Sequence, residues 1–302
     1  MTPPGQDPLD LVQQHWAQGE PDAALEQAGR LLAQARRERD RELELAAHFA
    51  LGRAQRALGR FAPALDHATT ILRLLEGPHD REPFGRAVLP YPEACGLGAL
   101  CRVELGDAQG ALDLVRRGER VTVVANHRAT SMTLAAAHGY VLAVTSRPRE
   151  TITLLEPAVL ARQDPELGGP SMLALGPLAL AYSAVGRAPH GIPLVRDAIA
   201  AQERAGTYLD RSWLVGTLAE VLLRAGRLDE AATVGGQALE LAERHGERGW
   251  EGLIRRTLGL IALERGDRAA ALEHFDEAQE IAEQLGMMPL VERCRAELRA
   301  LG

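Results

Sequence analysis

The chain has 302 residues, of which 46% are hydrophobic and 25% are charged, so it can bury a substantial core beneath an ordinary polar surface. A formal charge of −7 without a basic stripe excludes the electrostatic footprint that nucleic-acid phosphates require. All 34 basic residues are Arg, which excludes a P-loop lysine, a Schiff-base lysine and a lysine general base.

The N-terminal segment and the cysteines indicate the compartment. Met1–Gly5 has neither the basic nor the apolar region of a secretion signal, and no stretch approaches the roughly 18 uninterrupted apolar residues of a membrane span. Cys95, Cys101 and Cys294 form no CxxC pair. We therefore expect a cytoplasmic protein without a transmembrane helix or a disulfide framework.

Along the chain, helix-forming segments are interrupted by a recurring small-residue turn. The turns lie at positions 19, 59, 106, 146, 186, 226 and 266, so that five of the six intervals are 40 residues and one is 47. Each turn residue is Gly except Ser146. A regular spacing of this kind predicts a stack of helix pairs.

The residues around each turn have a physical explanation. Gly ends the first helix in the left-handed conformation, and Asp or Pro can then begin the second helix. A small residue follows five positions later and allows the paired helices to approach closely. These positions hold Ala24, Ala64, Ala111, Gly191, Ala231 and Ala271, with Thr151 as the exception.

This pattern resembles the tetratricopeptide repeat, whose small-residue, turn and Ala positions match Gly52, Gly59 and Ala64. The usual period is about 34 residues, whereas here it is 40. Residues 218–231 and 282–291 further resemble the C-terminal repeats of bacterial signalling ATPases, which carry nucleotide-cyclase or LuxR-type DNA-binding modules. The resemblance implies an all-α, right-handed superhelical solenoid that binds a protein or peptide and has no catalytic activity.

The spacing predicts a single solenoid of about seven helix pairs followed by an amphipathic, polar capping helix. The expected units are 5–40, 41–87, 88–127, 128–167, 168–207, 208–247 and 248–286, with the cap at 287–302. The longer interval places a seven-residue insertion within residues 76–92, where Gly and Pro are frequent. This insertion is either a longer surface connection or a functional loop that folds over the groove.

Residue patterns that carry chemistry are scarce. The nine His residues lack metal-ligand spacing, and neither HExxH nor GxSxG occurs, so no metal and no cofactor are expected. Asp164 and Glu166 flank Pro165 in a predicted loop, which favours a solvated turn over an acid–base pair. An α/α-barrel hydrolase remains a remote alternative, although such regular turns are not expected in one.

The resemblance also implies a concave groove lined by the first helix of each pair. Counting back from the turns nominates Trp16, Phe49, Arg53, Arg56, Leu100, Tyr140, Leu180, Trp213, Glu220, Arg224, Arg256 and Leu260. Arg suits a carboxylate or phosphate, and aromatic residues are frequent anchors in interfaces. The same aromatic residues could instead pack between units. The Lys and Asn clamp by which related repeats hold an acidic chaperone tail is absent, because the chain has no Lys and a single Asn, Asn126.

Two functions of different class follow. The first is a protein- or peptide-binding scaffold within, or derived from, a signalling ATPase. The second is a sensor whose groove closes on a short peptide or small molecule. Neither nucleic acid nor membrane is an expected partner, and the sequence leaves open the oligomeric state and whether the chain is a fragment or a stand-alone protein.

Overall fold

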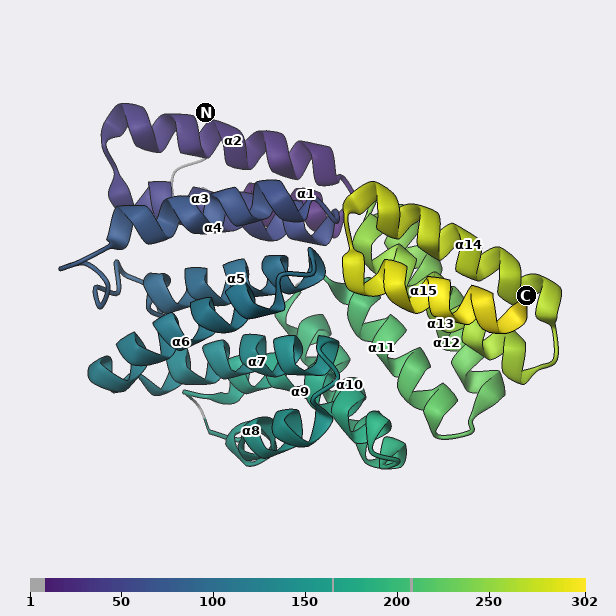
Figure 1. Ribbon diagram of the computed structural model, residues 1–302. Coiled ribbons are helices and arrows are strands. Elements are labelled where there is room, and N and C mark those ends of the chain that lie inside the picture. The colour runs from purple at the N-terminus through teal and green to yellow at the C-terminus, as the bar shows by residue number, and fades with distance from the viewer. Residues whose placement is uncertain (1–8, 165, 207–208) are drawn as a thin grey trace.

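The computed structural model describes residues 9–164, 166–206 and 209–302, and these residues form fifteen α-helices without any strand (Figure 1). In chain order the helices are α1 (Asp10–Ala17), α2 (Pro21–Glu38), α3 (Arg41–Ala57), α4 (Phe61–Leu75), α5 (Pro90–Glu104), α6 (Ala108–Ala125), α7 (Arg128–Val144), α8 (Pro148–Ala161), α9 (Gly168–Ala184), α10 (Ala188–Ala205), α11 (Arg211–Arg224), α12 (Leu228–Arg244), α13 (Arg248–Glu264), α14 (Arg268–Leu285) and α15 (Met288–Leu301). Consecutive helices pack against each other. None of them is long and apolar enough to cross a membrane.

The turns within the pairs have the geometry that the sequence predicts. Gly59, Gly226 and Gly266 have φ of 77°, 75° and 79°, and Ser146 takes the same left-handed conformation with φ of 59°. After the last of these turns, the Asp267 carboxylate accepts a hydrogen bond of 3.0 Å from the amide of Ala270. Asp107 caps α6 in the same way, whereas no side chain caps the second helix after Gly59 or Gly226.

Small residues allow the helices of a pair to pack closely. A Cβ added to Gly139 would lie 2.3 Å from Leu155 Cδ1, and one added to Gly259 would lie 2.6 Å from Phe275 Cε1. A larger residue at either glycine would force the facing side chain, or the helix that carries it, to move. The small residues that follow the turns, Ala64 among them, are fully buried.

Each helix pair falls inside one of the ranges expected for the seven units, and α15 falls inside the expected cap; the division into units stays a prediction. The first pair is short, because α1 has eight residues. The cap is more than a polar end. Leu290, Val291 and Cys294 of α15 are buried, and they join a core that also contains residues of α3, α4 and α5.

The superhelix bends back so that its two ends meet. Helix α3 contacts α13, and α5 contacts α15, as seen where the purple and blue helices approach the yellow ones in Figure 1. At one of these contacts, a Cβ added to Gly59 would lie 2.9 Å from the amide nitrogen of Gly249 and 2.6 Å from Leu285 Cδ1. The largest hydrophobic cluster accordingly combines residues of α3–α7 with residues of α14 and α15.

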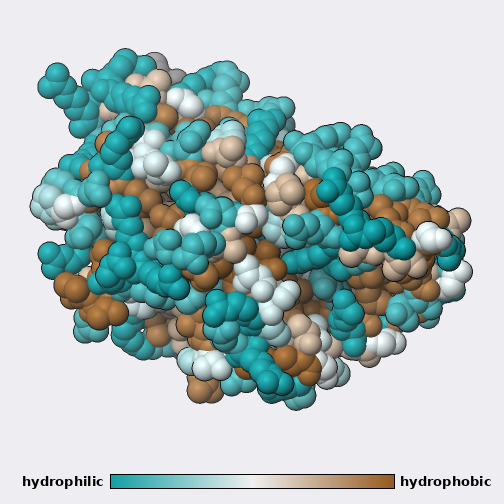
Figure 2. Space-filling view, viewed as in Figure 1, coloured by the Kyte–Doolittle hydropathy of each residue, from teal (hydrophilic) through white to brown (hydrophobic). Residues whose placement is uncertain are grey.

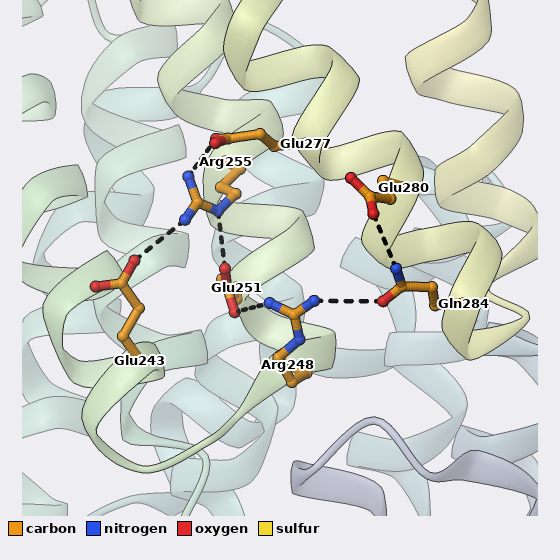
Figure 3. Close-up of polar contacts among 7 residues, drawn as sticks. All are labelled: Glu243, Arg248, Glu251, Arg255, Glu277, Glu280 and Gln284. Atoms are coloured by element: carbon orange, nitrogen blue, oxygen red, sulfur yellow. Dashed lines mark hydrogen bonds and ion pairs between the residues drawn. The ribbon is translucent and has the colours of Figure 1, made fainter.

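A charged network ties α12, α13 and α14 together (Figure 3). Arg255 donates to Glu243 at 3.1 Å and to Glu251 at 2.9 Å, and it also pairs with Glu277. Glu251 is 3% exposed and receives a second ion pair, of 2.8 Å, from Arg248. Elsewhere, Figure 2 shows hydrophilic residues over most of the visible face, with hydrophobic residues between them.

The predicted insertion forms a loop over residues 76–89, since Pro90 and Pro92 belong to the first turn of α5. The loop packs on α3: the Arg41 guanidinium lies 5.6 Å from the Phe84 ring centroid. It is also fixed at its end, where the Leu89 amide donates a 2.9 Å hydrogen bond to Thr130 Oγ1.

Candidate functional site

An interior cavity of about 420 Å³ lies among the first helices of successive pairs. Its walls come from the ends of α5, α7 and α9, from most of α11, from the first half of α13 and from the start of α15. This volume falls in the lower part of the range of roughly 300–1,000 Å³ that is typical of ligand pockets. The cavity is open to solvent at a mouth where Ser146, Ala184 and Arg224 are exposed, and α5 and α15 meet beside it.

Six of the residues nominated from the sequence line this cavity. They come from four helices, α7, α9, α11 and α13, and they are Tyr140, Leu180, Trp213, Glu220, Arg224 and Arg256. Their role as binding residues stays a prediction.

The other nominated residues lie elsewhere. Trp16 and Phe49 are 3% and 2% exposed and belong to the hydrophobic core, which is the packing alternative considered for them. Leu100 and Leu260 are half-buried outside the cavity lining. Arg53 forms a surface ion pair with Glu93.

Arg56, the remaining nominee, faces Asp210 across the junction between the two ends of the superhelix. Its side chain is 13% exposed, forms an ion pair with Asp210, and places its guanidinium carbon 5.3 Å from the centroid of Trp250. Trp250 Nε1 donates a 2.8 Å hydrogen bond to Asp210. Glu247 accepts a 2.9 Å hydrogen bond from the Asp210 amide and another from Ser212. We call this group, Arg56, Asp210, Ser212, Glu247 and Trp250, the closure cluster.

One end of the cavity is aromatic. The ring centroids of Tyr140 and Trp213 are 5.7 Å apart in an edge-on arrangement, and those of Trp213 and Trp250 are 6.1 Å apart. The Tyr140 hydroxyl donates to the carboxylate of Glu104, and burial raises the pKa of both groups. This end therefore offers a broad apolar surface beside a buried carboxyl group.

The other end carries charged groups from α11 and α13. Arg256 pairs with Glu297 of α15, and burial raises the pKa of Glu297. Glu220 and Arg224 lie one helical turn apart on α11. Across the ranges that the structure describes, neither side chain has a hydrogen bond or ion pair, so both are available to a ligand.

Arg293 lies on the wall between the two ends. It donates a 2.9 Å hydrogen bond to the carbonyl of Val144, and its charge acts on both Glu104 and Glu297. The repeat spacing did not nominate Arg293, because this residue follows the last turn and its position cannot be counted back from a turn. Thr217 and Thr257 also line the cavity. They are 40 residues apart and hold equivalent positions in their units, so the repeat spacing could have identified them; they lie one position away from a position that the count used.

The described part of the chain contains no group of three or more His, Cys, Asp or Glu residues that could hold a metal ion. Burial raises the pKa of Cys95, Cys101 and Cys294 to about 12, which keeps these thiols protonated and unreactive. Asp164 and Glu166 lie at the surface, paired with Arg128 at 2.8 and 3.1 Å. Pro165 between them lies outside the described residues.

The loop over residues 76–89 does not reach the cavity, since none of its residues belongs to the lining. The residues that the loop contacts, Arg41 of α3 and Thr130 of α7, do not line the cavity either. The idea of a loop folded over the groove therefore gains no support from its position, which is that of a surface connection.

Comparison with known proteins assigns the fold. The tetratricopeptide repeat profile matches residues 210–284, which include α11, α12 and α13 and most of α14. A Rap protein solved as a complex with Competence and Sporulation Factor is similar in structure, with a TM-score of 0.64 and 11% sequence identity over 95% of this chain and 79% of that one. The fold is of the tetratricopeptide-repeat type. No curated protein sequence matches this chain.

Two further solved tetratricopeptide-like structures are more distant. One is a tetratricopeptide repeat protein from Parabacteroides merdae ATCC 43184, with a TM-score of 0.45 and 16% identity over 94% of this chain and 97% of that one. The other is the apo form of RapI, with a TM-score of 0.45 and 11% identity over 97% of this chain and 86% of that one.

Proposed function

We propose that this chain is a non-catalytic binding protein that takes a peptide, or a short segment of a partner protein, into the interior cavity. The observation that carries the proposal is the cavity itself, which combines an aromatic surface with a Glu and an Arg that have no partner among the described residues. The similar Rap protein was solved with a factor bound, and this supports a binding role for the fold.

A thermal-shift screen with short peptides tests the proposal. A ligand of the folded state raises the free energy of unfolding by RT ln(1 + [L]/Kd), or about 2.7 kcal/mol at a hundredfold excess over Kd. Trp213→Ala and Arg224→Ala should each abolish the shift. Arg149→Ala is the matched control, because Arg149 is exposed on α8 and does not line the cavity. Binding that survives both cavity variants would contradict the assignment.

A ligand-responsive sensor is the second candidate, and the position of the cavity favours it. The walls come from the middle of the superhelix, with Glu104 and Tyr140 of α5 and α7, and from its C-terminal part, with Trp250 and Arg293. A ligand that contacts both sides stabilises the closed arrangement. A sensor should show a small-angle scattering change with its ligand, whereas a scaffold should co-purify with a defined protein and keep its dimensions.

The setting of the chain is also a proposal. An origin within a bacterial signalling ATPase rests on the likeness of residues 218–231 and 282–291, and a genomic reading frame that continues into an ATPase tests it. A cytoplasmic location without nucleic-acid or membrane partners rests on the net charge of −7 and on the reduced, buried cysteines.

A further inference from the structure

The junction between the two ends of the superhelix brings the turns of the first two pairs against the turn that joins α12 to α13. A Cβ added to Gly19 would lie 3.4 Å from the carbonyl oxygen of Arg244, and one added to Gly59 would lie 2.9 Å from the amide nitrogen of Gly249. Around the turns of three later pairs, no described atom lies within 4 Å of such a Cβ; these turns are at Gly186, Gly226 and Gly266. Because turns make this contact, it can part while every helix stays folded.

The closure cluster places two carboxyl groups at this junction and, within the described ranges, pairs only one of them with a cation. The Arg56 guanidinium pairs with Asp210. Glu247 is 1% exposed, and it is hydrogen-bonded to the Asp210 amide and the Ser212 hydroxyl, neither of which carries a charge. A buried carboxylate without a cation is strongly disfavoured. The closed junction therefore favours the protonated form of Glu247.

The proton of Glu247 is coupled to closure because the closed and parted states bind it differently. Burial, and next the charge of Asp210, raise the pKa of Glu247 from 4.5 to about 8 in the closed state. When the junction parts, water reaches this carboxyl group and its pKa returns toward the usual value. Closing thus takes up a proton, and its equilibrium constant falls by up to about tenfold for each pH unit between 4.5 and about 8.

Other charged groups around the same turn do not follow this pattern. His245 is 6% exposed, and burial together with the neighbouring Arg244 lowers its pKa from the usual 6.5, so His245 is neutral above that pH. Three further sets of charges near the junction form ion pairs: His15 with Glu20, Glu203 with Arg211, and Arg248 with Glu251.

Helices α3 and α5 contribute the remaining charges. Burial lowers the pKa of Arg56, but the charge of Asp210 raises it by more, so Arg56 keeps its charge. Glu104 of α5 also acts on Arg56, and burial raises the pKa of Glu104 as well. A substitution of Glu247 alone therefore distinguishes between these two carboxyl groups.

We propose that the proton on Glu247 acts as the latch of the superhelix. With the proton in place, the first two pairs stay against the turn between α12 and α13. Without it, Asp210 and Glu247 carry two negative charges beside the guanidinium of Arg56, and the junction parts, with the contact between α5 and α15 as its pivot. Parting removes Arg56 from Trp250, a residue of the cavity wall, so the latch changes the cavity whether or not the cavity takes a peptide.

Fluorescence energy transfer across the junction tests this inference. Dyes on Arg30→Cys of α2 and Gln237→Cys of α12 occupy exposed positions on its two sides, and the native cysteines are buried. We expect high transfer at pH 6 and lower transfer at pH 9, with unchanged helix content by circular dichroism. Glu247→Gln, which cannot lose a proton, should give the pH 6 value at both. Glu264→Gln should behave as the wild type, because Glu264 is exposed at the end of α13.

Equal transfer at pH 6 and pH 9 in the wild-type protein would overturn the inference. A fall of the same size in Glu247→Gln would also overturn it, since another group would then be responsible. If Glu247→Gln does not fold, Glu247→Met replaces it, because Met also has no proton to lose and fills a similar volume. A loss of helix content in step with the transfer would mean that the whole protein unfolds, which contradicts a latch at the junction.

Discussion

The closure cluster gives the sharpest test of how the two ends of the superhelix are held together. Arg56 of α3 and Asp210 before α11 are 154 residues apart in sequence, and their side chains are 13% and 19% exposed. Arg56→Met keeps the aliphatic stem beside Trp250 but leaves the Asp210 carboxylate without its cation. Loss of one partner from a buried ion pair costs about 3–5 kcal/mol. Because Asp210 keeps its hydrogen bond from Trp250 and some contact with water, we expect about 3 kcal/mol, at the lower end of that range.

Arg53→Met is the matched control on the same helix. The Arg53 side chain is 46% exposed, and its partner Glu93 keeps a second ion pair, of 2.8 Å, with Arg86. An exposed pair of this kind contributes at most about 1 kcal/mol. Urea denaturation followed by circular dichroism and by tryptophan fluorescence measures both variants. If Arg56→Met destabilises the protein no more than Arg53→Met does, the closure cluster does not hold the ends together.

A double-mutant cycle then separates the ion pair from other effects of the substitution. In Asp210→Asn the carboxylate charge is absent, so Arg56→Met in that background should cost at least about 1 kcal/mol less than in the wild type. Additive effects of the two changes would mean that Arg56 contributes through packing on Trp250 alone.

Two more predictions concern the same junction. Burial raises the pKa of Glu247 from 4.5 to about 8, with the neighbouring Asp210 charge as a further cause, so the folded state binds a proton that the unfolded state has lost. The stabilising effect is complete below pH 4.5 and is lost as the pH rises to about 8. The free energy of unfolding of the wild type should therefore fall between pH 4.5 and about 8 and level off above, and this slope should be absent in Glu247→Gln. Gly59→Ala should destabilise the protein by about 1 kcal/mol more than Gly226→Ala in urea denaturation, since both residues have positive φ but only Gly59 meets Gly249 across the junction. Equal costs at the two glycines would refute a close contact there.

The helix pairs were predictable because their causes are local. A glycine such as Gly59 ends a helix through its own backbone freedom, and the fully buried Ala64 lies five residues later in the same unit. Such signals repeat with the unit, so their spacing can be counted. The same spacing nominated Trp213 and Arg224, because first helices of successive pairs present equivalent faces; both residues line the cavity, and Arg224 is exposed at its mouth.

The closure of the superhelix was not predictable in this way. It depends on small rotations between successive units, which add up over 150 residues. No local residue pattern in the sequence reveals the total rotation. Arg56 was nominated for the groove, yet the bend of the chain brings it against Asp210 and Trp250. Phe49 was nominated by the same count, and it lies in the core that α15 completes.

Closure of the superhelix also explains why some nominated residues lie in the core and others line the cavity. The first helices α1 and α3 lie where the two ends meet, so their inward residues pack against other helices instead of facing solvent. From α7 to α13 the inward residues of the first helices line the cavity, although α13 also contacts α3 at the junction. A single register therefore gives core positions in the first two helix pairs and cavity-lining positions from the fourth pair to the seventh. The closure cluster lies on the boundary between the two, and Trp250 belongs to both: one face of its ring is under Arg56, and the residue also lines the cavity. A change that opens the junction at Arg56 should therefore also weaken any ligand that packs against Trp213 and Trp250.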